Sequence, residues 1–120
     1  MATVKMTTEM FKEKIFNYED HKEWQFNGER PILIDFYADW CAPCKMIAPI
    51  LEELSEDFKD QVDIYKVNTE SEQELSAVFG IRSIPSLLFV PKEGLPKLQA
   101  GAMHKQGLTE LIKTELLNES

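Results

Sequence analysis

Two periods of hydrophobic spacing take turns along this chain, one typical of β-strands and the other of α-helices. Short apolar or alternating runs predict strands at Thr3–Met6, Ile32–Ala38, Val62–Val67, Ser86–Val90 and Lys97–Ala100. Apolar residues three and four apart predict helices from Thr7 or Thr8 to Phe16, from Cys41 to about Phe58, from Ser71 to Gly80 and from Lys105 to Leu117. Strands and helices thus alternate in the first half, and a hairpin lies in the second.

This order predicts one α/β domain over residues 1–120. Alternating strands and helices favour parallel pairing with right-handed crossovers, and the hairpin adds antiparallel strands. We therefore expect a mixed central sheet of four to five strands, flanked by helices on both faces. Residues Ile32–Ala38 are almost continuously apolar, which indicates the central strand, and one acid, Asp35, interrupts them. Pro49 lies inside the second helix and should kink it.

The charge balance excludes several classes of partner. Asp and Glu outnumber Lys and Arg by 21 to 13, a net charge of −8, so we expect neither nucleic acid nor an anionic membrane as a partner. No segment approaches the roughly 20 apolar residues that span a bilayer. Charged residues interrupt the first 16 positions, so no signal-peptide core is visible and we expect a cytoplasmic protein. A leader already removed would instead place it in the periplasm.

The strongest candidate for chemistry is the cysteine pair Cys41 and Cys44, at the junction of a buried strand and a helix. A helix N-terminus favours a thiolate, so the pKa of Cys41 should fall. Pro43 fits the first helical turn and stiffens the loop. We expect Cys41, at the exposed tip, to attack a disulfide and Cys44, about one turn deeper, to resolve the mixed disulfide. Trp40 should cover one flank of the pair.

The pair has three other interpretations. A structural bridge would close a tiny loop and contribute only about 2 kcal/mol. A zinc site needs four ligands, and His21 and His104 have no ligand spacing, so we expect no metal. Two inert, buried thiols remain an alternative, which the strand-to-helix position disfavours.

The segment Ile34–Lys45 resembles the active-site signature of the thioredoxin family. The similarity extends from about Pro31 to Leu117 and includes Pro49, Lys66–Asn68, Gly80–Ser86 and Gly101–Ala102. The resemblance implies the thioredoxin fold and a protein-disulfide reductase.

The resemblance also assigns roles to single residues. Asp35 corresponds to the family's buried acid, which helps move the proton of the second cysteine; a carboxyl in an apolar strand should indeed have a raised pKa. Lys66 would neutralise this acid or tune it. Pro85 corresponds to a cis-proline that faces the dithiol and leaves the Ile84 backbone free to pair with an extended substrate. The implied docking surface consists of Trp40, Ala42, Pro43, Ile84, Pro85, Gly101 and Ala102.

The implied partners are disulfide-containing proteins and a flavin-dependent thioredoxin reductase that supplies electrons from NADPH. The protein itself would be a monomer with no bound cofactor. One alternative is a disulfide oxidant or isomerase, but such relatives often carry a histidine between the cysteines, where this chain has Ala42 and Pro43. Another is a binding module without redox turnover, against which both cysteines, Asp35 and Pro85 argue.

Three features depart from the family pattern. Ala42 stands where thioredoxins usually have Gly, which leaves the redox potential open. Tyr37 stands where many members have Trp. The segment Tyr18–Arg30, with an expected turn at Asn27-Gly28, is longer than in the shortest members and should be a surface elaboration pinned by Trp24 and Phe26.

Overall fold

The computed structural model describes residues 3–119. Its strands are β1 (Val4–Lys5), β2 (Ile32–Tyr37), β3 (Asp63–Asn68), β4 (Ser86–Val90) and β5 (Lys97–Ala100). Its helices are α1 (Thr8–Lys14), α2 (Ala42–Asp57), α3 (Gln73–Val78) and α4 (Lys105–Leu111), the last continued by one π-helical segment, η1 (Ile112–Leu116). The predicted order of elements is confirmed.

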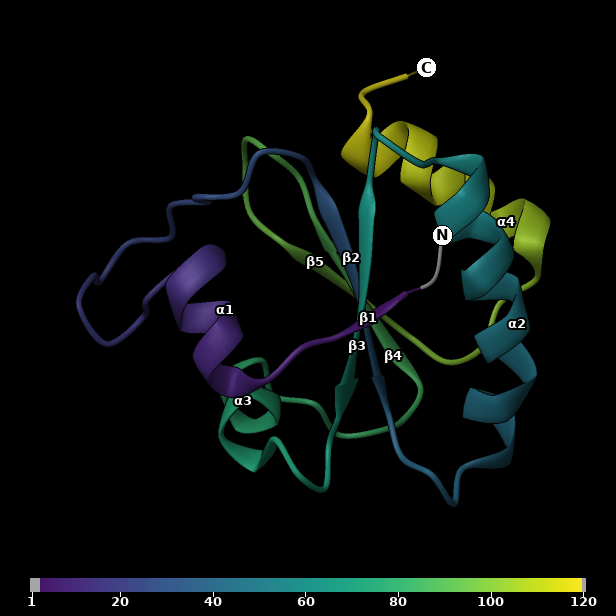
Figure 1. The fold of residues 1–120 in the computed structure, drawn as a ribbon, viewed down its shortest axis with the longest axis horizontal. Helices are drawn as coiled ribbons and strands as arrows, with labels where there is room; N and C mark the ends of the chain where they lie inside the picture. Colours follow the sequence, from purple (N-terminus) through teal and green to yellow (C-terminus); the bar gives the residue numbers. More distant parts are fainter. Residues whose placement is uncertain (1–2, 120) are drawn as a thin grey trace.

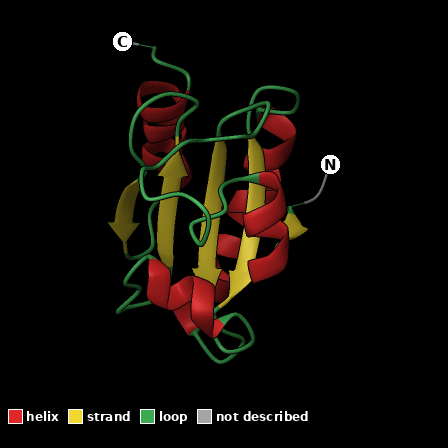
Figure 2. Cartoon of the chain, turned by 90° about the vertical axis from the view of Figure 1, so that its left-hand side faces the viewer, coloured by secondary structure: helices red, strands yellow, loops and turns green. Residues whose placement is uncertain are grey.

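The strands form one five-stranded sheet in the order β1-β3-β2-β4-β5. Strand β3 pairs in parallel with both β1 and β2, whereas β4 pairs antiparallel with β2 and β5. Figure 2 shows the strands side by side, with β1 and β5 at opposite edges. The expected mixed sheet is therefore confirmed, and β2 is its central strand.

Two helical layers cover the sheet, α1 and α3 on one face and α2 and α4 on the other (Figure 1). Because side chains alternate across a strand, β2 contributes Leu33 to the core under α2 and α4, and Ile34 and Phe36 to the core under α1 and α3. All six residues of β2 are buried, as its apolar run predicts. The face toward α2 is the one that also carries Asp35.

Two local predictions were wrong. Ser71 does not cap α3; Glu72 holds the cap position without a side-chain bond, because the Ser71 hydroxyl donates instead to the Asn68 carbonyl. Asn27-Gly28 is not a turn; bends lie at residues 22–23 and 29–30, and the Asn27 N–H donates to the Ile15 carbonyl. Tertiary anchoring of this loop to α1 replaces the local turn.

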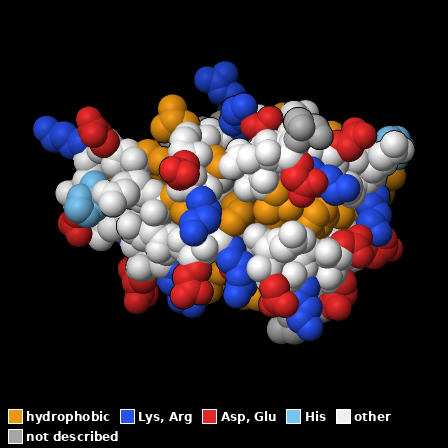
Figure 3. Space-filling view, turned by 90° about the horizontal axis from the view of Figure 1, so that it is seen from above, with side chains coloured by type: hydrophobic (Ala, Val, Ile, Leu, Met, Phe, Trp, Pro, Cys, Tyr) orange, Lys and Arg blue, Asp and Glu red, His pale blue; other side chains and the backbone are white. Residues whose placement is uncertain are grey.

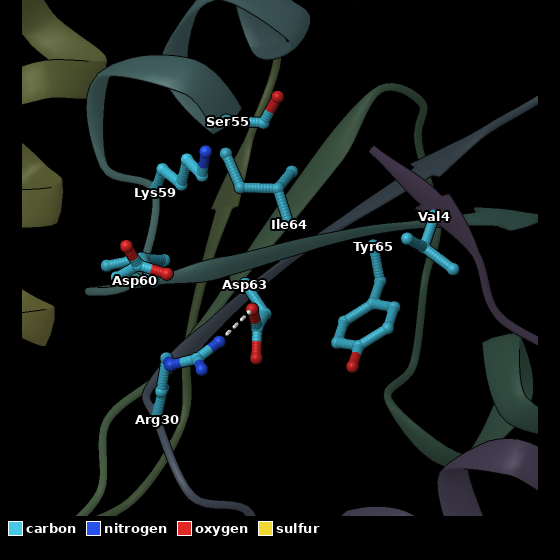
Figure 4. A pocket seen from close by; sticks show the side chains of 9 residues that line it. Val4, Arg30, Ser55, Lys59, Asp60, Asp63, Ile64 and Tyr65 are labelled. Carbon is cyan, nitrogen blue, oxygen red and sulfur yellow. Dashed lines mark hydrogen bonds and ion pairs between the residues drawn. The ribbon is translucent and has the colours of Figure 1, made fainter. Parts of the chain in front are cut away.

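The end of the molecule where the C-terminus lies carries basic and acidic side chains interspersed around a hydrophobic strip (Figure 3). A surface hollow of about 250 Å³ opens beside the start of β3, between edge strand β1 and the end of α2. Figure 4 shows the ion pair of Arg30 with Asp63, 3.0 Å long, on its wall. None of the helices within residues 3–119 is long and apolar enough to cross a membrane.

Candidate active site

The dithiol lies where β2 leads into α2. Cys41 is the N-cap of α2 in an extended conformation (φ −90°, ψ 110°), and its sulfur accepts the N–H of Cys44 at 3.2 Å. The two cysteines form a disulfide, with their Cα atoms 5.3 Å apart. Ala42 and Pro43 occupy the first two helical positions, and the first turn contains no acid. The unpaired N–H groups and positive dipole end of a 16-residue helix therefore face this sulfur.

The cysteines are less accessible than predicted. Cys41 and Cys44 are each only 4% exposed in this disulfide form, so the expectation of an exposed Cys41 is wrong for the oxidised protein. The cause is packing: the pair clusters with Tyr37 and Ala38, and Ile84 lies against the cluster. Ala42 and Pro43, which lie between the two cysteines in the first turn of α2, are exposed.

A pocket of about 120 Å³ connects Asp35 with the second cysteine. Asp35, Lys66 and Cys44 all line it, and it is roomy enough for several water molecules. Asp35 is 1% exposed, and its Oδ1 has no hydrogen-bond partner. Burial raises the pKa of Asp35 to about 7, and the charge of Lys66 opposes this rise. The carboxyl therefore exchanges its proton near neutral pH, as its place in an apolar strand predicts.

Lys66 does not neutralise Asp35 by direct contact. The two residues are paired in register across β2 and β3, yet no ion pair found among residues 3–119 joins them. The Lys66 ammonium lies instead over the ring of Tyr37, 4.8 Å from its centroid. This geometry fits a Lys66 that tunes the pKa of Asp35 from a distance.

The other predicted site residues come from three loops. The Ile84–Pro85 bond is cis, and the Gly101 N–H donates to the Pro85 carbonyl at 2.8 Å, which brings the loop before β4 against the loop after β5. Gly101 has φ +93°, a conformation that favours glycine. Pro85 is buried, whereas Ile84 and Gly101 are partly exposed and Ala102 is exposed.

Trp40, predicted to cover one flank of the pair, is 68% exposed. Its indole N–H donates to Glu70 Oε2 at 2.6 Å, and a groove of about 390 Å³ runs between Trp40 and Ile84. Sequence reasoning missed Glu70, and the only available signal was its place just after a predicted strand. Within the described range 3–119 no cluster of three or more His, Cys, Asp or Glu side chains is placed to hold a metal ion.

Comparison with known proteins agrees with this geometry. Residues 2–114 match the family model described as Thioredoxin. The chain belongs to the thioredoxin family. Among its relatives, thioredoxin from Borreliella burgdorferi is 44% identical over 110 residues, covering 92% of this chain and 94% of that one. Thioredoxin from Bacillus subtilis is 35% identical over 116 residues, covering 97% of this chain and 100% of that one.

A solved structure of chloroplastic thioredoxin z has the same fold, with a TM-score of 0.79 at 21% identity over 95% of this chain and 94% of that one. Thioredoxins are protein-disulfide oxidoreductases that need no bound cofactor. With its cysteine pair at bonding distance, this family member is accordingly an enzyme of dithiol–disulfide exchange.

Proposed function

We propose that the protein reduces disulfides in other proteins, with Cys41 as the attacking and Cys44 as the resolving sulfur. The observation that carries this assignment is the N-cap position of Cys41, whose sulfur accepts the Cys44 N–H. The same N–H and helix dipole favour the thiolate once the disulfide is reduced. Cys44 lies within the first turn, where it reaches Cys41.

The exchange proceeds in two displacements. The Cys41 thiolate attacks one sulfur of a substrate disulfide, forms a mixed disulfide and releases the first substrate thiolate. The Cys44 thiol then gives its proton to the Asp35 carboxylate through the pocket that both residues line, and its sulfur attacks Cys41. The Cys41–Cys44 disulfide forms, the second substrate thiolate leaves, and the protein has lost the two electrons that the substrate gained.

The surface around the disulfide supports docking of an extended substrate segment. The Gly101–Pro85 hydrogen bond joins the Ile84–Pro85 loop to the Gly101–Ala102 loop, and Trp40 lines the same groove as Ile84. Ala42 and Pro43 are exposed between the two cysteines. None of the loop hydrogen bonds within residues 3–119 uses the Ile84 backbone. We infer that this backbone pairs with the substrate as an added strand.

A thioredoxin reductase would return the oxidised protein to the dithiol form with electrons from NADPH. The residues between the cysteines, Ala42 and Pro43, provide no cation that would make the disulfide strongly oxidising. A reductant of this kind works in a reducing compartment, so we place the protein in the cytoplasm. We expect it to be a monomer.

Insulin reduction tests the assignment of the two sulfurs. Cys41→Ser should lower turnover, with dithiothreitol or with NADPH and thioredoxin reductase, to the rate without protein. Cys44→Ser should stop after the first displacement and accumulate a mixed disulfide on Cys41, detectable by mass spectrometry. Turnover by the Cys41→Ser variant, or a substrate trapped on Cys44, would reject the assignment.

A further inference from the structure

Three polar side chains share one wall of the pocket beside Cys44. Asp35 and Tyr37 lie two residues apart on β2, so both face α2. Lys66 on β3 is the register partner of Asp35 and therefore faces the same side. All three line the pocket together with Cys44. Two groups could therefore interact with the Lys66 ammonium: the Asp35 carboxyl and the Tyr37 ring.

The structure shows which neighbour holds it. The Lys66 Nζ lies 4.8 Å from the Tyr37 ring centroid, a distance at which the negative face of the ring attracts a cation. Asp35 Oδ1 is buried without a partner, and no ion pair within residues 3–119 links the two residues. Tyr37 is itself only 9% exposed, so its ring has little freedom to turn away.

We propose that Tyr37 is a positioning residue: its ring holds the Lys66 ammonium beside Asp35 but out of direct contact, and so preserves Asp35 as a proton acceptor. The inference rests on the proposed function, in which Asp35 takes the proton of Cys44. An ammonium drawn onto the carboxylate would stabilise the ionised form and make it a weaker base. An ammonium absent altogether would leave Asp35 protonated over a wider pH range.

Other charged groups also line the pocket. Asp39, from the loop after β2, and Lys45, from α2, line the same pocket. On the remaining side β4 places the apolar Leu87 next to Asp35. Burial is the larger cause of the raised pKa of Asp35, and the charge of Lys66 opposes it, so a change in the position of Lys66 should shift that pKa.

The direct test is the pH titration of the Asp35 carboxyl carbon by NMR in the oxidised protein. Tyr37→Leu removes the ring, and the ammonium should move to the carboxylate, lowering the Asp35 pKa by about one pH unit. Tyr37→Phe and Tyr37→Trp keep an aromatic face and should leave the titration midpoint within about 0.3 pH unit of the wild type. Tyr37→Met provides a second non-aromatic variant of similar length if Tyr37→Leu does not fold.

The matched control repeats the change without the cation. In a Lys66→Met background, Tyr37→Leu should no longer lower the Asp35 pKa. An equal decrease in both backgrounds would show that the ring merely excludes water, and would overturn the proposal. An unchanged or higher midpoint in Tyr37→Leu alone would also overturn it.

Failure of the proposed function has a separate signature. If Asp35→Asn leaves the rate of the Cys44 step unchanged between pH 6 and pH 8, Asp35 is not the proton acceptor. The NMR titration measures the influence of Tyr37 without any turnover, so its outcome does not depend on that rate.

Discussion

The raised pKa of Asp35 makes the folding stability of this protein depend on pH. It lies in the central strand with 1% exposure, and burial raises its pKa to about 7. In the unfolded chain the carboxyl ionises near its ordinary pKa of about 4. Folding therefore holds a proton that the unfolded state has already lost, and stability falls as the pH rises from about 4 to about 7.

Asp35→Asn should remove this loss of folding stability at rising pH, because an amide does not ionise. At pH 8 the oxidised variant should be more stable than the wild type by roughly 2–4 kcal/mol, since each pH unit of a pKa difference corresponds to about 1.4 kcal/mol. At pH 4 the two proteins should have nearly equal stability. Guanidinium unfolding at both pH values measures this, with Asp60→Asn as the control for loss of one exposed carboxyl. A stability difference independent of pH would contradict the linkage.

At the scale of elements, the segment between α1 and β2 is an anchored part of the fold. Trp24 packs on Phe16, with ring centroids 4.9 Å apart, and lies 6.4 Å from Phe11 of α1. Tyr18 donates its hydroxyl hydrogen to Glu74 of α3, and Lys12 of α1 lies 2.9 Å from the same carboxylate. The segment thereby extends the core beneath α1 and α3, and none of these contacts reaches the dithiol.

Two substitutions of Trp24 separate packing from hydrogen bonding. Trp24→Ala should lower the unfolding free energy by roughly 2–4 kcal/mol, because it removes the ring that packs on Phe16 and leaves a cavity. Trp24→Phe should cost less than about 1 kcal/mol, since it keeps the ring and removes an indole N–H that is buried without a partner. Insulin reduction per folded molecule should be the same in both variants. Equal destabilisation by the two changes would show that a ring at this position contributes no packing energy, and would contradict the prediction.

The whole molecule depends on two separate cores, and the disulfide belongs to neither. Each core joins one face of the sheet to a pair of helices, whereas the cysteines form a small third cluster with Tyr37 and Ala38. The bridge spans a sequence separation of only 3, so it restricts the unfolded chain little. Redox turnover can therefore proceed without loss of the fold.

Reduction should lower the unfolding free energy by about 2 kcal/mol, the chain-entropy contribution of so short a loop. Urea unfolding of the oxidised and reduced forms at the same pH measures the difference. The reduced form should keep its near-ultraviolet circular dichroism, because both cores remain packed. A reduced protein that is unfolded without denaturant would show that the cysteine cluster supports the fold.

By itself the sequence determined the order of the elements, the central strand and the place of the dithiol. These follow from local properties: the change between periods of two and 3.6, and the position of Cys41 just after a buried run. It also predicted a buried acid at Asp35, because a continuously apolar strand leaves such a side chain no route to water. The turn at Asn27-Gly28 was wrong for the converse reason, since a bond to the Ile15 carbonyl replaced the local one. The cap at Ser71 was wrong because its hydroxyl donates to a different local acceptor, the Asn68 carbonyl.

Only the tertiary structure decided how distant segments meet. The order of strands brings Lys66 opposite Asp35, Gly101 against Pro85 and Glu70 under Trp40. It also decided that the Lys66 ammonium lies on Tyr37 and that Cys41 is covered in the disulfide form. Hydrophobic periodicity records which face of an element is buried, but which side chain of another element it meets depends on packing across the whole sheet.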